Sequence, residues 1–140
     1  MAILHDDLLA TRANVVTVRR RLDEGIEREL QRGGTFGVSL NGHLWGLLNT
    51  LVERELQQPT PTSEDSLLAA STLGGPFRVV RFRRHLGTLI QLGYARRTPA
   101  ALHPTIRGIG AVRPFSTVDV PHRLPVDKLR SLRQAELGVL

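Results

Sequence analysis

Near the start of the chain, apolar residues recur every three or four positions across residues 6–32. They are Leu8, Val15, Val18, Leu22, Ile26 and Leu30. This spacing predicts one helix, with Asp6 as its N-cap and Gly33-Gly34 at its end. The helix would be about 40 Å long, so its apolar stripe would exceed what the core of one small domain can cover. We therefore expect the surplus to form a dimerisation surface, with packing across its own domain as the alternative.

Length and composition fit a single domain over residues 1–140, of which 41% are hydrophobic and none is cysteine. We divide it into an N-terminal helix in 1–34, a core in 39–112, and an extended linker with a C-terminal helix in 113–140. The absence of cysteine excludes a disulfide scaffold, a thiol nucleophile and thiolate metal ligands.

The C-terminal helix is predicted to begin at Pro125. Lys128, Arg130 and Arg133 are expected to face solvent from it. Its apolar residues are assigned to the same dimerisation surface as the stripe of the first helix. The predicted dimerisation residues are Val15, Val18, Leu22, Ile26, Leu129 and Leu132.

Proline and glycine residues divide the middle of the chain into shorter helices. Ser39 can cap a helix that ends near Gln58, and Trp45 in that helix is predicted to lie in the core. Thr62 can cap a short helix over 64–71, and the run Thr-Leu-Gly-Gly-Pro at 72–76 separates it from a helix over 77–92. Two helices joined by a tight glycine-containing turn make a helix-turn-helix candidate.

After Gly93, the sequence predicts a small hairpin whose strands flank residues 99–101. Thr105 can cap a short helix over 106–112, in which Gly108 and Gly110 lower the helix propensity. Residues 113–124 are expected to be extended. The predicted fold is therefore mainly α with a small β-hairpin.

Positive charge is concentrated in one segment. The chain has 19 basic and 13 acidic residues, for a net charge of +6. Residues 66–118 contain no acid, but they contain Arg78, Arg81, Arg83, Arg84, Arg96, Arg97, Arg107 and Arg113. A local asymmetry of this kind favours one surface that faces a polyanion, with a solvated basic face as the alternative.

The helix over 77–92 carries most of the predicted contacts. Val79, Phe82, Leu86, Leu89 and Ile90 fall on one side and are expected to be buried. The opposite side has the chemistry that reads bases in the major groove, because arginine binds guanine and methyl groups contact thymine. The predicted base contacts are Val80, Arg81, Arg84 and Thr88, and the predicted phosphate contacts are Arg78, His85, Arg96, Arg97 and Arg107.

Two motifs carry a family resemblance. Leu89-Ile-Gln-Leu-Gly93-Tyr-Ala-Arg-Arg matches the Leu-x-x-x-Gly ending of a recognition helix that leads into a basic strand. Leu102-His-Pro-Thr105-Ile-Arg-Gly108 approximates the Leu-Thr-x-x-Gly run after a wing. With the order of the elements, these residues resemble a winged helix-turn-helix domain of the MarR type of bacterial regulator. The resemblance implies a homodimer that reads a pseudo-palindromic DNA site and dimerises through its terminal helices.

Other functional classes find little support in the sequence. The five histidines are scattered and none forms a metal-binding pair, so no metal or cofactor is expected. Asp119 and His122 could act as acid and base, but no nucleophile or phosphate loop accompanies them, so no enzyme is expected. The start of the chain carries Asp6 and Asp7 where a signal peptide needs positive charge, and no run is long enough to span a membrane. We expect a cytoplasmic location.

The sequence thus predicts a dimeric transcriptional regulator that binds double-stranded DNA sequence-specifically, with residues 77–92 in the major groove. The sequence does not identify a small-molecule effector. Two alternatives stay open. One is a winged-helix adaptor, of phage or plasmid origin, that docks onto polymerase, replication or chromosome-segregation machinery. The other is a DNA-binding protein for plasmid partition or replication control.

Overall fold

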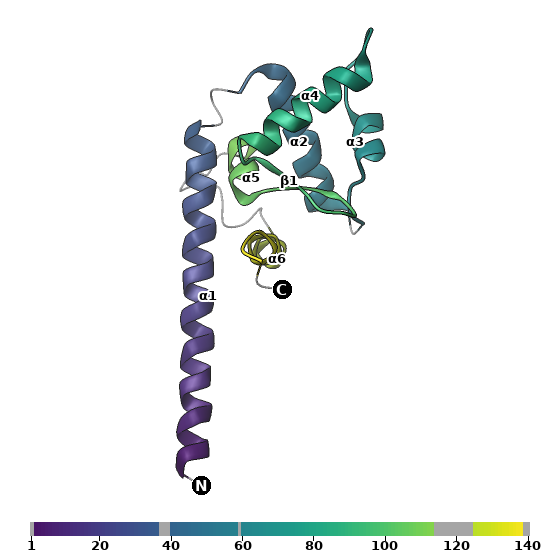
Figure 1. Ribbon diagram of the computed structural model, residues 1–140. Helices are drawn as coiled ribbons and strands as arrows, with labels where there is room; N and C mark the ends of the chain where they lie inside the picture. The colour runs from purple at the N-terminus through teal and green to yellow at the C-terminus, as the bar shows by residue number, and fades with distance from the viewer. Residues whose placement is uncertain (1, 37–39, 59, 114–124, 139–140) are drawn as a thin grey trace.

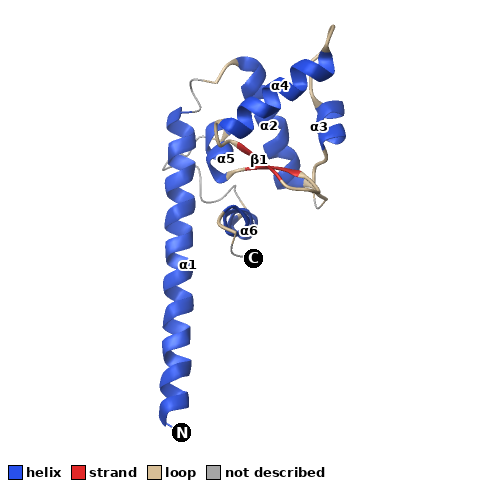
Figure 2. Ribbon diagram, viewed as in Figure 1, coloured by secondary structure: helices blue, strands red, loops and turns tan. Residues whose placement is uncertain are grey.

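A computed structural model describes residues 2–36, 40–58, 60–113 and 125–138, with side chains described from residue 15 onward and not at 36. The elements are α1 (Ala2–Phe36), α2 (Gly42–Gln57), α3 (Glu64–Ala70), α4 (Arg78–Gln91), β1 (Ala95–Arg97), β2 (Leu102–Pro104), α5 (Ile106–Val112) and α6 (Val126–Glu136). Elements α2 to α5 gather at one end of the rod-like α1, and the N-terminal half of α1 extends away from them (Figure 1). The chain is mainly helical with one two-stranded sheet, as predicted (Figure 2).

The hairpin confirms the predicted strand pairing. Strands β1 and β2 are antiparallel, with Arg96 opposite His103. The backbone N–H of Leu102 also donates to the carbonyl of Thr62 over 2.8 Å. This bond ties the hairpin to the segment that precedes α3.

The core lies where α2 meets α4, α5 and the hairpin. Its fully buried side chains include Leu48 and Leu51 of α2, Phe82 and Leu86 of α4, and Ile109 of α5. Two residues expected in this core are instead exposed, since Trp45 and Val79 retain 42% and 43% of their accessible surface. Both lie at the edge of their helix's apolar stripe, where periodicity alone does not decide burial.

Several helix ends differ from the predicted ones. Helix α1 already includes Asp6, so this residue is not the N-cap. Helix α2 is capped by Asn41, whose side chain accepts from the Leu44 N–H over 2.9 Å, and Ser39 lies outside the described residues. Helix α3 is capped by Ser63 rather than Thr62, which is buried. The extended segment expected after residue 113 lies mostly in 114–124, also outside the described residues.

Gly33 and Gly34 do not end α1, which continues to Phe36. Gly33 is buried against α5, and a methyl group there would overlap the carbonyl oxygen of Arg107. Gly110 of α5 lies equally close to the carbonyl of Leu30. The two helix backbones therefore touch through their glycines. The cap predicted for Thr105 is confirmed, because its hydroxyl accepts from the Gly108 N–H over 3.0 Å.

The terminal helices pack together within one chain. Ile26, Leu129 and Leu132 are buried in its core, and Leu22 is partly buried against it. Arg130 does not face solvent freely, since its Nε and Nη2 each donate to one carboxylate oxygen of Asp23 over 2.8 Å. For this half of α1 the alternative of packing within the domain holds, and the sequence could not tell which half of the stripe would find an intramolecular partner.

Replacing Gly33 with alanine should destabilise the protein by about 1–3 kcal/mol or more, because the added methyl forces the backbones of α1 and α5 apart. Gly25→Ala, in the same helix, is the matched control. A methyl there would meet only the Arg133 side chain at 3.7 Å, and removing a helical glycine should stabilise by about 0.5–1 kcal/mol. Denaturant unfolding measures both. Equal effects of the two substitutions would contradict the glycine-mediated packing.

The ion pair between Asp23 and Arg130 should make stability depend on pH in the acid range. The hydrogen bond from Arg130 holds the pKa of Asp23 below its ordinary value of 3.8. The stabilisation is therefore complete above that value and is lost as pH falls through the lower folded-state pKa. Asp23→Asn should lower the melting temperature at neutral pH, and the difference from wild type should shrink on acidification. Glu27→Gln, an exposed position on the same helix, should show no such convergence.

Candidate nucleic-acid interface

The outward side of α4 is formed by the residues of this helix that do not pack into the core. Phe82, Leu86 and Leu89 anchor the helix in the core. Arg84 is exposed, and its guanidinium has no hydrogen-bond or ion-pair partner in the part of the chain that is described. Val80, one turn earlier, retains 56% of its accessible surface. These two predicted base contacts therefore lie together on an open helix surface that carries no acid.

The other two predicted base contacts are engaged within the protein. Arg81 is partly buried, and its Nη1 donates to the carbonyl of Gly74 over 2.8 Å. The hydroxyl of Thr88 donates to the carbonyl of Arg84 over 3.0 Å. The Arg81 side chain is thus directed toward the segment between α3 and α4. Helical spacing alone had predicted that it points outward.

Arg78 fastens that same turn. Its Nε donates to the carbonyl of Leu73 over 2.7 Å, and its Nη2 donates to the carbonyl of Leu68 over 2.6 Å. The last carbonyls of α3 and the following turn are thereby satisfied by a guanidinium from α4. Arg78 was predicted to contact phosphate, but in the structure it bridges α4 to the end of α3 and the segment that follows it.

The predicted phosphate contacts on the hairpin and α5 differ in accessibility. Arg97 is half-exposed, with its Nη1 3.5 Å from a carboxylate oxygen of Glu64. Arg96 reaches α6, where its Nη1 donates to the carbonyl of Ala135 over 3.4 Å, and its Nε is buried without a described partner. Arg107 donates from Nε to Glu29 over 2.9 Å. Only Arg97 of these three lies beside α4 with much of its side chain exposed.

The ion pair with Arg107 affects the pKa of Glu29. Burial acts to raise the pKa of the Glu29 carboxyl, but the hydrogen bond and charge of Arg107 outweigh burial and hold the pKa below its ordinary value. The carboxylate is ionised at neutral pH and neutralises Arg107 at the junction of α1 and α5. This part of the predicted basic surface is therefore largely compensated.

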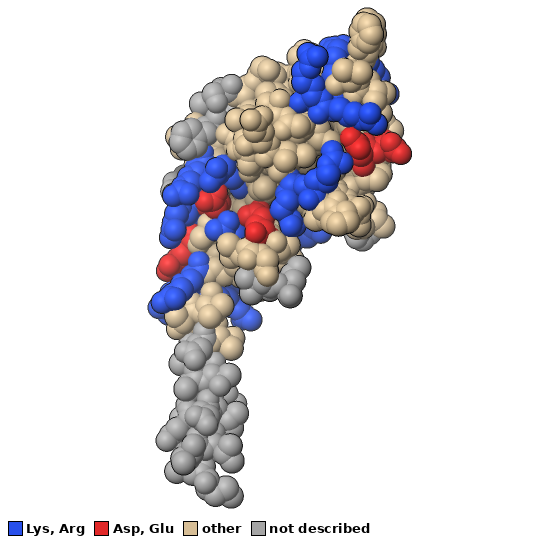
Figure 3. Space-filling model, viewed as in Figure 1, with Lys and Arg blue, Asp and Glu red and all other residues tan. Residues whose placement is uncertain are grey.

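One acidic residue lies within the basic face. Glu64 of α3 is 3.7 Å from Arg83 Nε as well as close to Arg97, so it bridges α4 and the hairpin. Figure 3 shows Lys and Arg side chains gathered over α4 and the hairpin, with an acidic patch beside them at α3. The acid-free segment 66–118 is thus in contact with Glu64, an acidic residue that lies just before it in the sequence. The Arg83 side chain is well exposed.

The start of α4 is strained. Phe77 occupies the cap position with φ of 59°, a left-handed conformation that costs a bulky residue about 1 kcal/mol or more. Its side chain is 78% exposed. The sequence pointed to the preceding Gly-Gly-Pro run as a breaker, but not to an aromatic side chain held open at the tip.

Two histidines that the sequence analysis did not pair, His43 of α2 and His85 of α4, lie next to each other. The rings of His43 and His85 are stacked with centroids 5.7 Å apart. Burial, followed by the charges of His43, Arg81 and Arg84, lowers the pKa of His85 below 6.5. His85 was predicted to contact phosphate, and in the structure it lines a cavity beside α2. The two residues are 42 positions apart, so the sequence gave no local signal for the pair.

Among the described residues, no group of three or more acidic or histidine side chains could hold a metal ion. Within the same ranges, no helix combines the length and apolar character needed to cross a membrane. Asp119 and His122, weighed as an acid and base pair, fall outside the described residues. Comparisons with protein-family models, with curated proteins and with solved structures found no match to the chain.

Proposed function

We propose that the protein is a dimeric winged-helix DNA-binding protein that regulates transcription, with α4 in the major groove. The observation that carries the proposal is the open surface of α4, where Arg84, which has no partner among the described residues, lies one turn from the exposed Val80. Arginine can bind a guanine edge with two hydrogen bonds, and a small apolar side chain can contact a thymine methyl. Arg81 would join them if its bond to Gly74 gives way to a base.

The arrangement of elements supports this proposal. Helices α3 and α4 are joined by a connection over residues 71–77 that contains Gly74, Gly75 and Pro76, and the β1–β2 hairpin follows α4. This order of elements is similar to that of a helix-turn-helix with a wing. Arg83 and Arg97, both close to Glu64, place two further cations along the same face. Such exposed cations fit phosphates on either side of a groove.

The proposed dimer uses the outer half of α1. Val15, Val16 and Val18 are exposed in the single chain, and Val18 retains 65% of its accessible surface. The apolar residues Leu22, Ile26 and Leu30 pack against the chain's own core, so the seam proposed here is shorter than the apolar stripe in the sequence. A partner helix laid along the outer half would bury these valines.

A protein-interaction adaptor is the second candidate. Phe77, Val79 and Val80 are exposed together at the start of α4, and apolar side chains at one tip favour contact with another protein. The two candidates differ in their response to salt. Binding that depends on phosphates weakens steeply as salt rises, whereas burial of apolar surface does not.

The purified protein should bind random duplex DNA, and log affinity should fall with log salt at a slope of about −0.9 per phosphate contacted. A site selected from genomic fragments should bind more tightly. Arg84→Ala should cost about 1–3 kcal/mol at that site, confined to one base-pair position, because it removes a base contact rather than a phosphate contact. Fluorescence anisotropy at matched salt measures both affinities.

Glu64→Gln is the matched variant, and it is expected to change DNA affinity in the opposite direction. It removes the negative charge between Arg83 and Arg97, so it should raise affinity for all sequences and make the salt dependence steeper. Absence of binding to any duplex at low salt would refute the DNA proposal and favour the adaptor. Equal loss at selected and scrambled sites in Arg84→Ala would instead favour a partition or architectural role.

Val18→Asp should convert the dimer to a monomer, since it places a charge in an apolar seam. The monomer should remain folded, because Val18 is exposed within its own chain. Val126→Asp, at a half-exposed valine of α6, should leave the dimer intact. Light scattering with a thermal melt tests both. An unchanged dimer in Val18→Asp would show that α1 does not form the interface.

A further inference from the structure

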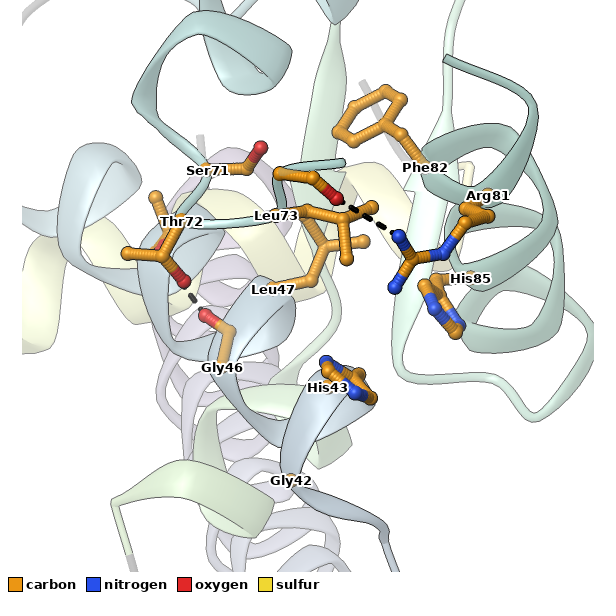
Figure 4. A pocket seen from close by; sticks show the side chains of 12 residues that line it. Gly42, His43, Gly46, Leu47, Ser71, Thr72, Leu73, Arg81, Phe82 and His85 are labelled. Atoms are coloured by element: carbon orange, nitrogen blue, oxygen red, sulfur yellow. Dashed lines mark hydrogen bonds between the residues drawn. The ribbon is translucent and has the colours of Figure 1, made fainter. Parts of the chain in front are cut away.

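A cavity of about 300 Å³ lies between the first turns of α2, the turn over residues 71–74, and α4. His43 projects from α2, and Arg81 and His85 project from α4, so that three nitrogen-bearing side chains lie around one space (Figure 4). Leu47, Leu73 and Phe82 supply its apolar wall. The volume is at the lower end of the range for small-molecule sites, about 300–1,000 Å³.

The formally charged side chain that lines the cavity, Arg81, is positive. Arg81 uses Nη1 for the Gly74 carbonyl, and its Nε and Nη2 have no hydrogen-bond partner in the described part of the chain. The first turn of α2, which includes Gly42, adds the positive end of a helix. No lining residue is acidic. The cavity therefore has donors and positive potential without a complementary anion.

The stacked histidines strengthen this asymmetry. His43 is the only titratable residue of α2 that lines the cavity, and α4 contributes Arg81 to the lining with Arg84 nearby. Residues 71–74 contribute no charge. Protonation of His85 is opposed by its burial and by the charges of His43, Arg81 and Arg84. An anion between them would remove this opposition.

We propose that this cavity binds a small molecule through an oxyanion group, a carboxylate or a phosphate, held by Arg81, His43 and His85. The free guanidinium nitrogens of Arg81 can donate to the oxyanion, with the two rings beside it. The apolar wall accommodates a short hydrocarbon or aromatic body. Because Arg81 also holds the turn before α4, an occupied cavity acts directly on the helix-turn-helix.

Binding is coupled to protonation. The pKa of His85 is lowered in the free protein, so this ring is mostly neutral at pH 7, and an adjacent anion stabilises its charged form. Affinity should therefore rise as pH falls, by up to about tenfold per pH unit for one linked proton. Benzoate stays ionised over this range, so an uncoupled site would show no change in its affinity for benzoate, and the pH comparison is therefore made with that probe.

The test uses the full chain without DNA, with benzoate and inorganic phosphate as probes. Histidine ring resonances observed by NMR should shift saturably for both His43 and His85 with at least one probe, and more tightly at pH 6 than at pH 7.5. The preferred probe distinguishes a carboxylate site from a phosphate site. Arg81→Gln should weaken binding about tenfold or more, as expected for a charge-assisted hydrogen bond. Arg84→Gln, on the open surface of the same helix, should weaken it far less.

His43→Gln provides a second variant that leaves the bond from Arg81 to Gly74 in place. It should also weaken binding, with a thermal melt confirming that the variant is folded. Shifts that grow linearly with probe concentration, or that are equal in wild type and Arg81→Gln, would overturn the proposal. Since DNA is absent from the test, either result leaves the proposed DNA binding to be decided by its own experiment.

Discussion

The contact between α1 and α5 depends on glycines that let the two helix backbones touch. Gly33 lies against the carbonyl of Arg107, and Gly110 lies against that of Leu30. Gly108, on the same short helix, is packed against the carbonyl of Tyr94 before the hairpin. Helix α5 is thus held tightly between the long helix and the hairpin. A side chain at any of these positions would separate elements that the rest of the fold requires to be close.

Polar interactions then fix the remaining elements around this contact. The buried carboxylate of Glu55 in α2 meets Nδ1 of His103 at 2.9 Å and Nζ of Lys128 at 3.7 Å, which joins α2 to β2 and α6. A buried carboxylate would be costly without such partners. Arg130 and Asp23 join α6 to α1. The terminal helices are consequently part of the same core rather than separate arms, and in the described part of α1 the exposed apolar residues are Val15, Val16 and Val18.

The cationic residues divide into two groups with different roles. Arg78, Arg96 and Arg107 donate to carbonyls or carboxylates within the protein, where they satisfy helix ends and join elements. Arg83, Arg84 and Arg97 are exposed around α4 and the hairpin, and their only acidic neighbour is Glu64 among the described residues. The net positive charge of the sequence therefore overstates the charge that a polyanion would meet. The face proposed to bind DNA is therefore smaller than the basic segment of the sequence, and it is confined to α4 and the hairpin.

The sequence by itself determined the helical elements, the hairpin and most of the burial in α4. These features follow from local periodicity, from breakers such as Pro76, and from caps such as Thr105, which act over a few residues. It also located Arg84 and Val80 on an exposed surface, because both lie opposite the side that Phe82 anchors. Gly33 and Gly34 were misassigned as a helix end, since propensity carries no information about the helix α5 that packs against Gly33. Asp6 was misassigned as an N-cap, and it lies inside α1.

Only the tertiary structure decided which arginines are free, which half of α1 is covered, and that His43 meets His85. Each of these outcomes depends on groups far apart in sequence, such as Asp23 with Arg130 or Arg96 with Ala135. The local sequence around an arginine does not show whether its guanidinium faces solvent or donates to a carbonyl of another helix. Its partner is chosen when the elements pack, because an unpaired polar group is costly in the interior and nearly free in water.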